Sequence, residues 1–161
     1  MRICVQLVVV ASLLLGFGLQ LASAADGDAI SVDLKAFTFK VKEEVASLFG
    51  YNEGEGKLFY YTGGPAEATV KIPADGDYEI VIRASGDPAQ NERAKFKVTL
   101  GGEAVGKETL LTSDLPKEYK LTAKAKAGEQ KLVIEYTNDV YKENEFDRNF
   151  YVHAVKLTRA K

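Results

Sequence analysis

The sequence predicts an all-β protein, an antiparallel β-sandwich of the jelly-roll type, and three observations support this fold class. First, apolar and polar residues alternate along several short runs, as in strands with one face toward a core and one toward water. Second, turn-forming residues separate these runs. Third, only residues 42–48 have a composition that could form a helical turn. Many short alternating runs with turns between them are typical of sandwiches and jelly rolls.

The expected strands follow one another along the chain. The first alternates at Ile30, Val32 and Leu34 and then changes phase, which predicts a bulge or bend near residues 35–36. Gly101-Gly102 lies between two runs and predicts a tight hairpin. The apolar positions of the later runs are Val70, Ile72; Tyr78, Ile80, Ile82, Ala84; Phe96, Val98, Leu100; Tyr119, Leu121, Ala123; and Leu132, Ile134, Tyr136.

Residues 1–24 have the features of a secretory signal peptide. Arg2 supplies a positive charge, residues 5–21 are mostly apolar, and Ala22-Ser23-Ala24 is the small-x-small pattern that signal peptidase requires. The apolar run is short for a membrane span, and a retained membrane anchor is the alternative. We therefore expect residues 25–161 to form one exported domain, secreted, periplasmic or on the cell surface, without stable membrane insertion.

Composition excludes several functions. The chain has 161 residues and one cysteine, Cys4, which lies in the expected signal peptide, so the mature protein has no disulfide framework and no thiolate chemistry. The formal net charge is −2, whereas a nucleic-acid partner requires a basic face. The composition does not indicate an oligomeric state.

Residues 137–149 form the densest polar segment, between a strand ending at Tyr136 and a last strand at residues 150–157. It holds four carboxylates and three side-chain amides. Calcium takes six to eight oxygen ligands of these kinds in a flexible geometry. The spacing is not that of an EF-hand, and a solvated charged loop is the alternative reading. The residues of this segment that we consider as ligands are Asn138, Asp139, Asn144, Glu145 and Asp147.

A sequence motif sharpens this interpretation. Tyr136-Thr137-Asn138-Asp139, followed after a variable loop by Asp147-Arg148-Asn149-Phe150-Tyr151-Val152, resembles the signature of calcium-dependent xylan-binding modules of carbohydrate-binding module families sixty and thirty-six. The resemblance implies a sandwich fold and a calcium ion whose shell is completed by vicinal sugar hydroxyls. It implies Asp139 and Asp147 as carboxylate ligands and Asn138 as a further ligand. This chain departs from the pattern in having no tryptophan and in having Phe150 in place of leucine.

The same resemblance suggests which side chains contact the sugar. Phe146 and Tyr141 are the candidates to pack on the apolar face of a sugar ring. Arg148 has two readings. It contacts the sugar, or its guanidinium is held between Asp147 and other acids and fixes the loop.

Two further features have alternative readings. The glycine-rich loop at residues 50–56 is a plain surface turn, or it borders the binding face and offers Tyr51 and Glu53 to a ligand. His153, the only histidine, is expected on one face of the last strand with Tyr151 and Val155, as a satisfied or surface residue and not a catalytic one.

These observations predict a non-catalytic, lectin-like module that binds a polysaccharide or oligosaccharide such as xylan, with calcium as cofactor. The alternative is a structural or adhesion sandwich of the cell surface, in which calcium only stabilises the loop. A small hydrolase is a third possibility, but no GxSxG elbow accompanies the single histidine, and the sequence gives no sign of a deep cleft.

Overall fold

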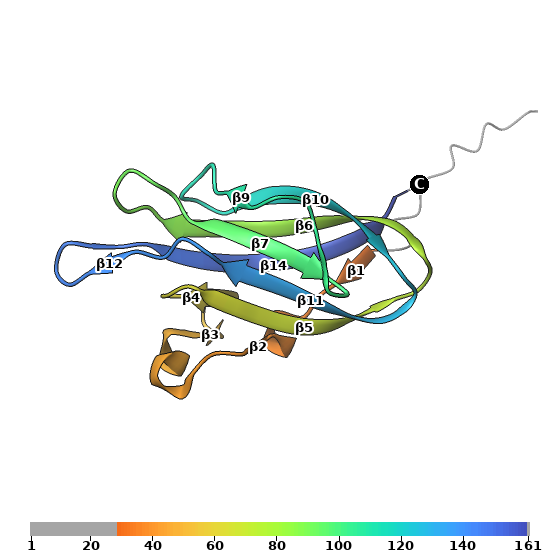
Figure 1. The fold of residues 1–161 in the computed structure, drawn as a ribbon, viewed down its shortest axis with the longest axis horizontal. Coiled ribbons are helices and arrows are strands. Elements are labelled where there is room, and N and C mark those ends of the chain that lie inside the picture. The colour runs from red at the N-terminus through yellow and green to blue at the C-terminus, as the bar shows by residue number, and fades with distance from the viewer. Residues whose placement is uncertain (1–28, 161) are drawn as a thin grey trace, which may run out of the picture.

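Two antiparallel sheets pack face to face in the structure, a computed structural model that describes residues 29–160 (Figure 1). The expected signal peptide, residues 1–24, lies outside this part of the chain. The strand order of the first sheet is β10-β6-β14-β4-β3, with β1 also paired to β14. The strands of this sheet are β1 (Ala29–Ser31), β3 (Phe49–Asn52), β4 (Lys57–Tyr60), β6 (Gly76–Asp87), β10 (Lys117–Ala125) and β14 (Asn149–Arg159).

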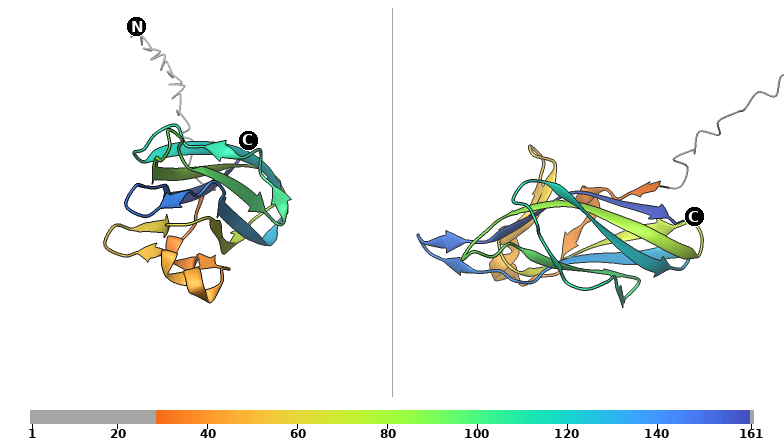
Figure 2. Two further views of the ribbon diagram at one scale, coloured as in Figure 1. Left: turned by 60° about the vertical axis from the view of Figure 1, so that its left-hand side comes forward. Right: turned by 90° about the horizontal axis from the view of Figure 1, so that it is seen from above.

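The second sheet has the order β2-β5-β11-β7-β8, with β9 also paired to β7. Its strands are β2 (Thr38–Phe39), β5 (Gly64–Ile72), β7 (Lys95–Leu100), β8 (Glu103–Ala104), β9 (Thr109–Leu110) and β11 (Gly128–Tyr136). A separate two-stranded ribbon, β12 (Tyr141–Lys142) with β13 (Phe146–Asp147), projects from one end of the sandwich (Figures 1 and 2). The two ends of the described chain lie at the opposite end (Figure 1).

The alternating residues identified in the sequence line the space between the sheets. Most of them are buried, which confirms the predicted fold class. The Gly101-Gly102 hairpin is also confirmed, because both glycines have positive φ and connect the paired strands β7 and β8. The phase change near residue 35 is a 3-10 helix, η1 (Leu34–Ala36), and the helical turn expected at residues 42–48 is the 3-10 helix η2 (Glu43–Leu48).

An aromatic cluster fills the core beneath the end that carries the β12–β13 ribbon. Phe150 is fully buried at its centre, with ring centroids 5.2 Å from Tyr60, 5.3 Å from Phe96 and 5.7 Å from Tyr136. Offset and tilted ring pairs at such distances add to the stabilisation from burial. Because Phe150 follows Asn149 directly, this packing fixes where β14 begins.

A β-bulge in β14 corrects one sequence expectation. The pairing of β14 with β6 shifts register between Val152 and Ala154. Val152 and Val155 therefore both face the core, and His153 does not share a face with Val155 as the strict alternation had predicted. Sequence alternation alone could not locate the extra residue.

Within residues 29–160, no helix is long and apolar enough to cross a membrane.

Candidate functional site

A pocket of about 610 Å³ opens at the end of the sandwich that carries the β12–β13 ribbon. Three parts of the chain build it: η2, the segment after β4, and the stretch from the end of β11 to the start of β14. Four of its lining residues are polar and three are large and apolar. They are Thr62, Asp139, Asp147 and Asn149, with Leu48, Tyr61 and Tyr141.

Asp139 is half-buried in the wall of this pocket, with its two carboxylate oxygens in different surroundings. Oδ2 accepts a hydrogen bond from Thr62 Oγ1 at 2.9 Å, whereas Oδ1 is buried without a hydrogen-bond partner. Burial raises the pKa of Asp139. The Thr62 hydroxyl and the backbone N–H groups of Gly63 and Val140 partly offset this effect, whereas the nearby carboxylate of Asp147 adds to it. A cation at Oδ1 would remove the cost of this buried negative charge.

Asn149 has the second unpartnered oxygen of the pocket. Its Nδ2 donates to Asp147 Oδ2 at 3.1 Å and to Asp87 Oδ2 at 3.3 Å, so that the amide nitrogen faces two carboxylates. The amide oxygen, Oδ1, is buried and has no hydrogen-bond partner. This orientation follows from the hydrogen-bond network, because reversing the amide would place its oxygen against both acids.

The donor set of the pocket fits calcium. Asp139 Oδ1 and Asn149 Oδ1 are the only buried side-chain oxygen or nitrogen atoms in residues 29–160 that have no hydrogen-bond partner, and both belong to residues that line this pocket. Buried unsatisfied polar atoms in a native fold call for an ion or a water. In the same part of the chain, no three histidine, cysteine or acidic residues gather at one point. A site here would therefore combine two carboxylates with oxygens from side-chain amides, backbone carbonyls, water or a bound ligand. Such a set suits calcium better than zinc.

Large, partly exposed side chains line the same pocket. Tyr141 is 64% exposed, Tyr61 is 41% exposed and Leu48 is 37% exposed. Aromatic surface beside polar oxygens suits a sugar ring, which has apolar C–H groups on its face and hydroxyls around its edge.

Comparison with known proteins decides the family. Residues 79–161 match the family CBM60, described as a calcium-dependent carbohydrate-binding module that binds xylan. This chain belongs to the CBM60 family. The matched segment extends from β6 to the end of the chain and includes Asp139, Asp147 and Asn149. No match was found among curated proteins.

Solved structures share the fold of this CBM60 module at low sequence identity. One is the CBM36-1 domain of a multidomain xylanase from the hindgut metagenome of Trinervitermes trinervoides (TM-score 0.58, 16% identity, 83% of this chain and 99% of that chain). Another is a CBM36 in complex with calcium and xylotriose (TM-score 0.55, 15% identity, 82% and 98%). A third is a GH26-CBM35 β-(1,4)-mannanase of Podospora anserina (TM-score 0.53, 13% identity, 83% and 28%), in which the match covers only part of the enzyme.

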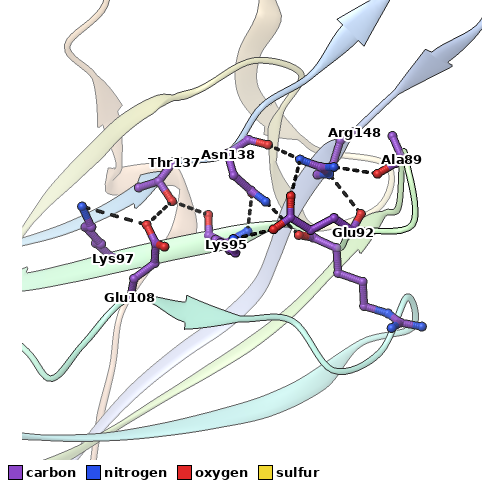
Figure 3. A network of polar contacts seen from close by, with 9 residues as sticks. Ala89, Glu92, Lys95, Lys97, Glu108, Thr137, Asn138 and Arg148 are labelled. Atoms are coloured by element: carbon purple, nitrogen blue, oxygen red, sulfur yellow. Dashed lines mark hydrogen bonds and ion pairs between the residues drawn. The ribbon is translucent and has the colours of Figure 1, made fainter.

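Arg148 of the module joins the two segments that carry the pocket aspartates (Figure 3). It is 4% exposed, and its guanidinium donates to the backbone carbonyls of Ala89, Glu92 and Asn138. Its own N–H donates to Val140 O at 3.0 Å. The structural reading of Arg148 therefore describes its position, with one correction: its partners are carbonyl oxygens and the Glu92 carboxylate at 3.4 Å, and not Asp147.

Asn138 does not line the pocket, although the sequence suggested it as a ligand. Its Oδ1 accepts from Lys95 N at 2.6 Å, and its Nδ2 donates to Arg93 O at 3.0 Å (Figure 3). Both ends of the amide are thus used to attach the loop to β7 and to the residues just before it. The neighbouring Thr137 does the same, because its hydroxyl lies 3.2 Å from Lys95 O.

The other predicted residues are divided between the pocket and the surface around it. Asp139, Asp147 and Tyr141 meet in the pocket. Asn144 and Glu145 lie at the tip of the β12–β13 ribbon, where Asn144 has a φ of 60° and Glu145 pairs with Lys142.

Phe146, Tyr51 and Glu53 do not line the pocket either. Phe146 is paired with Lys142 in the ribbon. Tyr51 and Glu53 both contact Lys35, through a cation–π contact of 5.4 Å and an ion pair of 3.0 Å. The loop at residues 50–56 thus fits the surface-turn reading.

Sequence reasoning missed Leu48, Tyr61, Thr62 and Asn149 as pocket residues. Asn149 stands inside the motif that we had identified, and its position two residues after Asp147 was the available signal. The run Phe59-Tyr60-Tyr61 is aromatic throughout, so that periodicity could not assign its faces.

Tyr136→Phe should destabilise the backbone beside the pocket. The Tyr136 hydroxyl donates to Arg148 O at 2.8 Å in a buried position, and its loss leaves that carbonyl unpaired. We expect a loss of about 1–2 kcal/mol in the free energy of unfolding, measured by urea denaturation. Tyr78→Phe, which removes a 2.9 Å bond to Ala74 O at the opposite end of the sandwich, is the matched control. A calcium affinity that falls in the first variant and not in the second would separate support of the pocket from general stability.

His153 should make the folding stability of the module depend on pH in the acid range. Its Nε2 lies 2.8 Å from Ser85 Oγ, and burial, with Lys57 and Arg83 nearby, lowers its pKa below the ordinary 6.5. The unfolded chain therefore binds more protons than the native chain, and stability should fall as the pH drops from about 6.5 through the lower native pKa. His153→Gln should flatten this part of a stability-against-pH curve. Since no other histidine is present, an unchanged slope would contradict the assignment.

Proposed function

We propose that this protein is a non-catalytic, exported module that binds xylan or a closely related polysaccharide, with calcium held in the pocket by Asp139 and Asp147. The observation that carries the proposal is the convergence of two unpartnered buried oxygens, from Asp139 and Asn149, beside exposed aromatic rings. Membership of a calcium-dependent, xylan-binding family supports it, as does the fold shared with a CBM36 that holds calcium and xylotriose.

Each pocket residue has a role in this proposal. Asp139 Oδ1, a carboxylate oxygen of Asp147 and Asn149 Oδ1 would hold the cation. Thr62 holds Asp139 Oδ2 through its hydrogen bond, which leaves Oδ1 as the oxygen available to the cation. When bound, calcium supplies positive charge and coordination positions that two neighbouring sugar hydroxyls can fill. Tyr61 and Tyr141 then cover the apolar face of the sugar ring.

Retention on insoluble xylan tests the proposal. The purified protein should be retained in calcium and released by a chelator, and calcium should raise its Tm. Mannan, cellulose and galactan serve as comparison polymers. Stabilisation by calcium without retention on any polymer would favour the alternative of a structural or adhesion sandwich. Absence of both responses would reject a calcium site at this pocket.

Export is tested separately. We expect cleavage after Ala24, so that N-terminal sequencing of the exported protein begins at Ala25. Release of reducing sugar from xylan should stay at the level of a protein-free blank, because we assign no general acid or base to the pocket.

A further inference from the structure

Three aromatic rings lie side by side on the outer face of the first sheet, next to the pocket. Leu58 and Tyr60 of β4 are buried in the core, so that the residue between them, Phe59, faces outward. Phe59 lies opposite Tyr151 of β14 in the strand register, and Tyr61 follows one alternation later at the pocket. Cross-strand aromatic pairs of this kind stabilise a sheet.

The Phe59 ring packs directly against the backbone of Gly50. The two residues are opposite each other in the pairing of β3 with β4. A Cβ atom at Gly50 would come within 2.7 Å of Phe59 Cζ and 2.8 Å of Cε1, which real Cβ atoms essentially never do. The ring can occupy this position only because residue 50 has no side chain.

Phe59 in turn supports Tyr61. Their ring centroids are 4.8 Å apart with an interplanar angle of 32°, so that one face of Tyr61 is covered by Phe59. Tyr61 is nevertheless 41% exposed and lines the pocket. The uncovered part of its ring is therefore available to a guest.

Tyr151 fixes the same ring from another side. It meets Tyr61 edge-on, with centroids 6.3 Å apart and an angle of 84°. The Tyr151 hydroxyl donates to Asp87 Oδ2 at 2.7 Å, and the same oxygen accepts from Asn149 Nδ2. The Asp87 carboxylate thus helps to hold both the Tyr151 ring and the Asn149 amide in place.

From these contacts we infer that Phe59, which packs against Gly50, is a positioning residue for sugar binding that acts through the ring of Tyr61. The inference rests on the proposed function. Phe59 does not line the pocket and touches no ligand oxygen. It holds the Tyr61 ring at a fixed orientation relative to Asp139 and Asn149, so that a pyranose ring can stack on Tyr61 while its hydroxyls reach the cation. The ligand class that this geometry selects is a sugar with an apolar ring face free of axial hydroxyls, as in β-linked xylose or glucose.

A double-mutant cycle tests this assignment, with xylohexaose titrated in saturating calcium chloride by calorimetry. Phe59→Leu and Tyr61→Ala should each weaken xylohexaose binding by about fivefold or more. In the Tyr61→Ala background, Phe59→Leu should cause no further loss, because Phe59 acts through the ring that has been removed. Gly50→Ala, which displaces the Phe59 ring, should resemble Phe59→Leu. Calcium affinity should stay within about twofold of the original value in all these variants.

Ile72→Ala is the control for general destabilisation, since Ile72 is buried at the far end of β5 from the pocket. It should lower the Tm without changing xylohexaose affinity. Additive losses in the cycle, or a Phe59→Leu variant that binds xylohexaose as tightly as the original protein, would overturn the inference. If the unaltered protein binds no xylohexaose in calcium, the proposed function itself fails, which is a different result.

Discussion

Asp139→Asn should abolish the response of this module to calcium. The substitution keeps the size of the side chain but removes the charge of a pocket-lining carboxylate whose Oδ1 is buried without a hydrogen-bond partner. We expect calcium affinity to fall by at least about a hundredfold, because the site has only two carboxylates to offset the ion. Retention on xylan should be lost with it. Calorimetric titration with calcium, followed by xylan retention, measures both effects.

In chelator, the same variant should not lower the folding stability of the protein. Burial raises the pKa of Asp139, so the ionised carboxyl destabilises the native state at neutral pH when no cation is present. For a group with a raised pKa, stability is greatest below the unfolded pKa and is lost as the pH rises through the native one. In chelator at pH 7, Asp139→Asn should therefore be at least as stable as the original protein.

Glu145→Gln is the matched control, since Glu145 lies at the exposed tip of the ribbon and pairs with Lys142 outside the pocket. It removes one negative charge from the same loop and should leave calcium affinity unchanged. If it weakened calcium binding as strongly as Asp139→Asn, the charge of the whole loop, and not the pocket, would hold the ion.

Arg148→Met should cause the largest loss of stability. The substitution removes the guanidinium donors to the backbone carbonyls of Ala89, Glu92 and Asn138. Ala89 O and Glu92 O each keep one backbone donor, whereas the Asn138 carbonyl is left unpaired. Losing three hydrogen bonds from a buried charged donor costs about 3 kcal/mol or more, which corresponds to a fall in Tm of roughly 10 °C for a domain of this size. Urea denaturation in chelator isolates this effect from any change in calcium binding.

Arg148→Lys separates charge from geometry. Lysine keeps the positive charge but cannot reach three carbonyls from one planar group, so we expect an intermediate loss of stability. A methionine variant within about 0.5 kcal/mol of the original protein would contradict the role assigned to this network.

The fold was predictable because its signals are local. Alternation at Tyr78, Ile80 and Ile82 needs only a strand with one buried face, and the turn residues between runs mark where strands end. The bulge in β14 was not predictable, since it depends on how that strand pairs with β6. The same reason explains His153, whose face changes with one inserted residue.

The site was predictable only in part, because pairing across long sequence distances completes it. The motif contains both Asp139 and Asp147, which line the same pocket. Tyr61 and Thr62 are brought there by the position of β4 beside β14, about ninety residues away in sequence, and no local pattern encodes this contact. The sequence pointed to Asn138 and not to Asn149 as a ligand, yet the Asn138 amide anchors its loop to Lys95, and it is Asn149 that lines the pocket.

The position of the chain ends has a practical consequence. Ala29 and Arg159 lie at the end of the sandwich opposite the ribbon, where β1 pairs with the last residues of β14 (Figures 1 and 2). A fluorescent reporter or a surface tether fused at either end would therefore stand away from the mouth of the pocket. Immobilised through either terminus, the module should present this mouth outward to a polymer in solution.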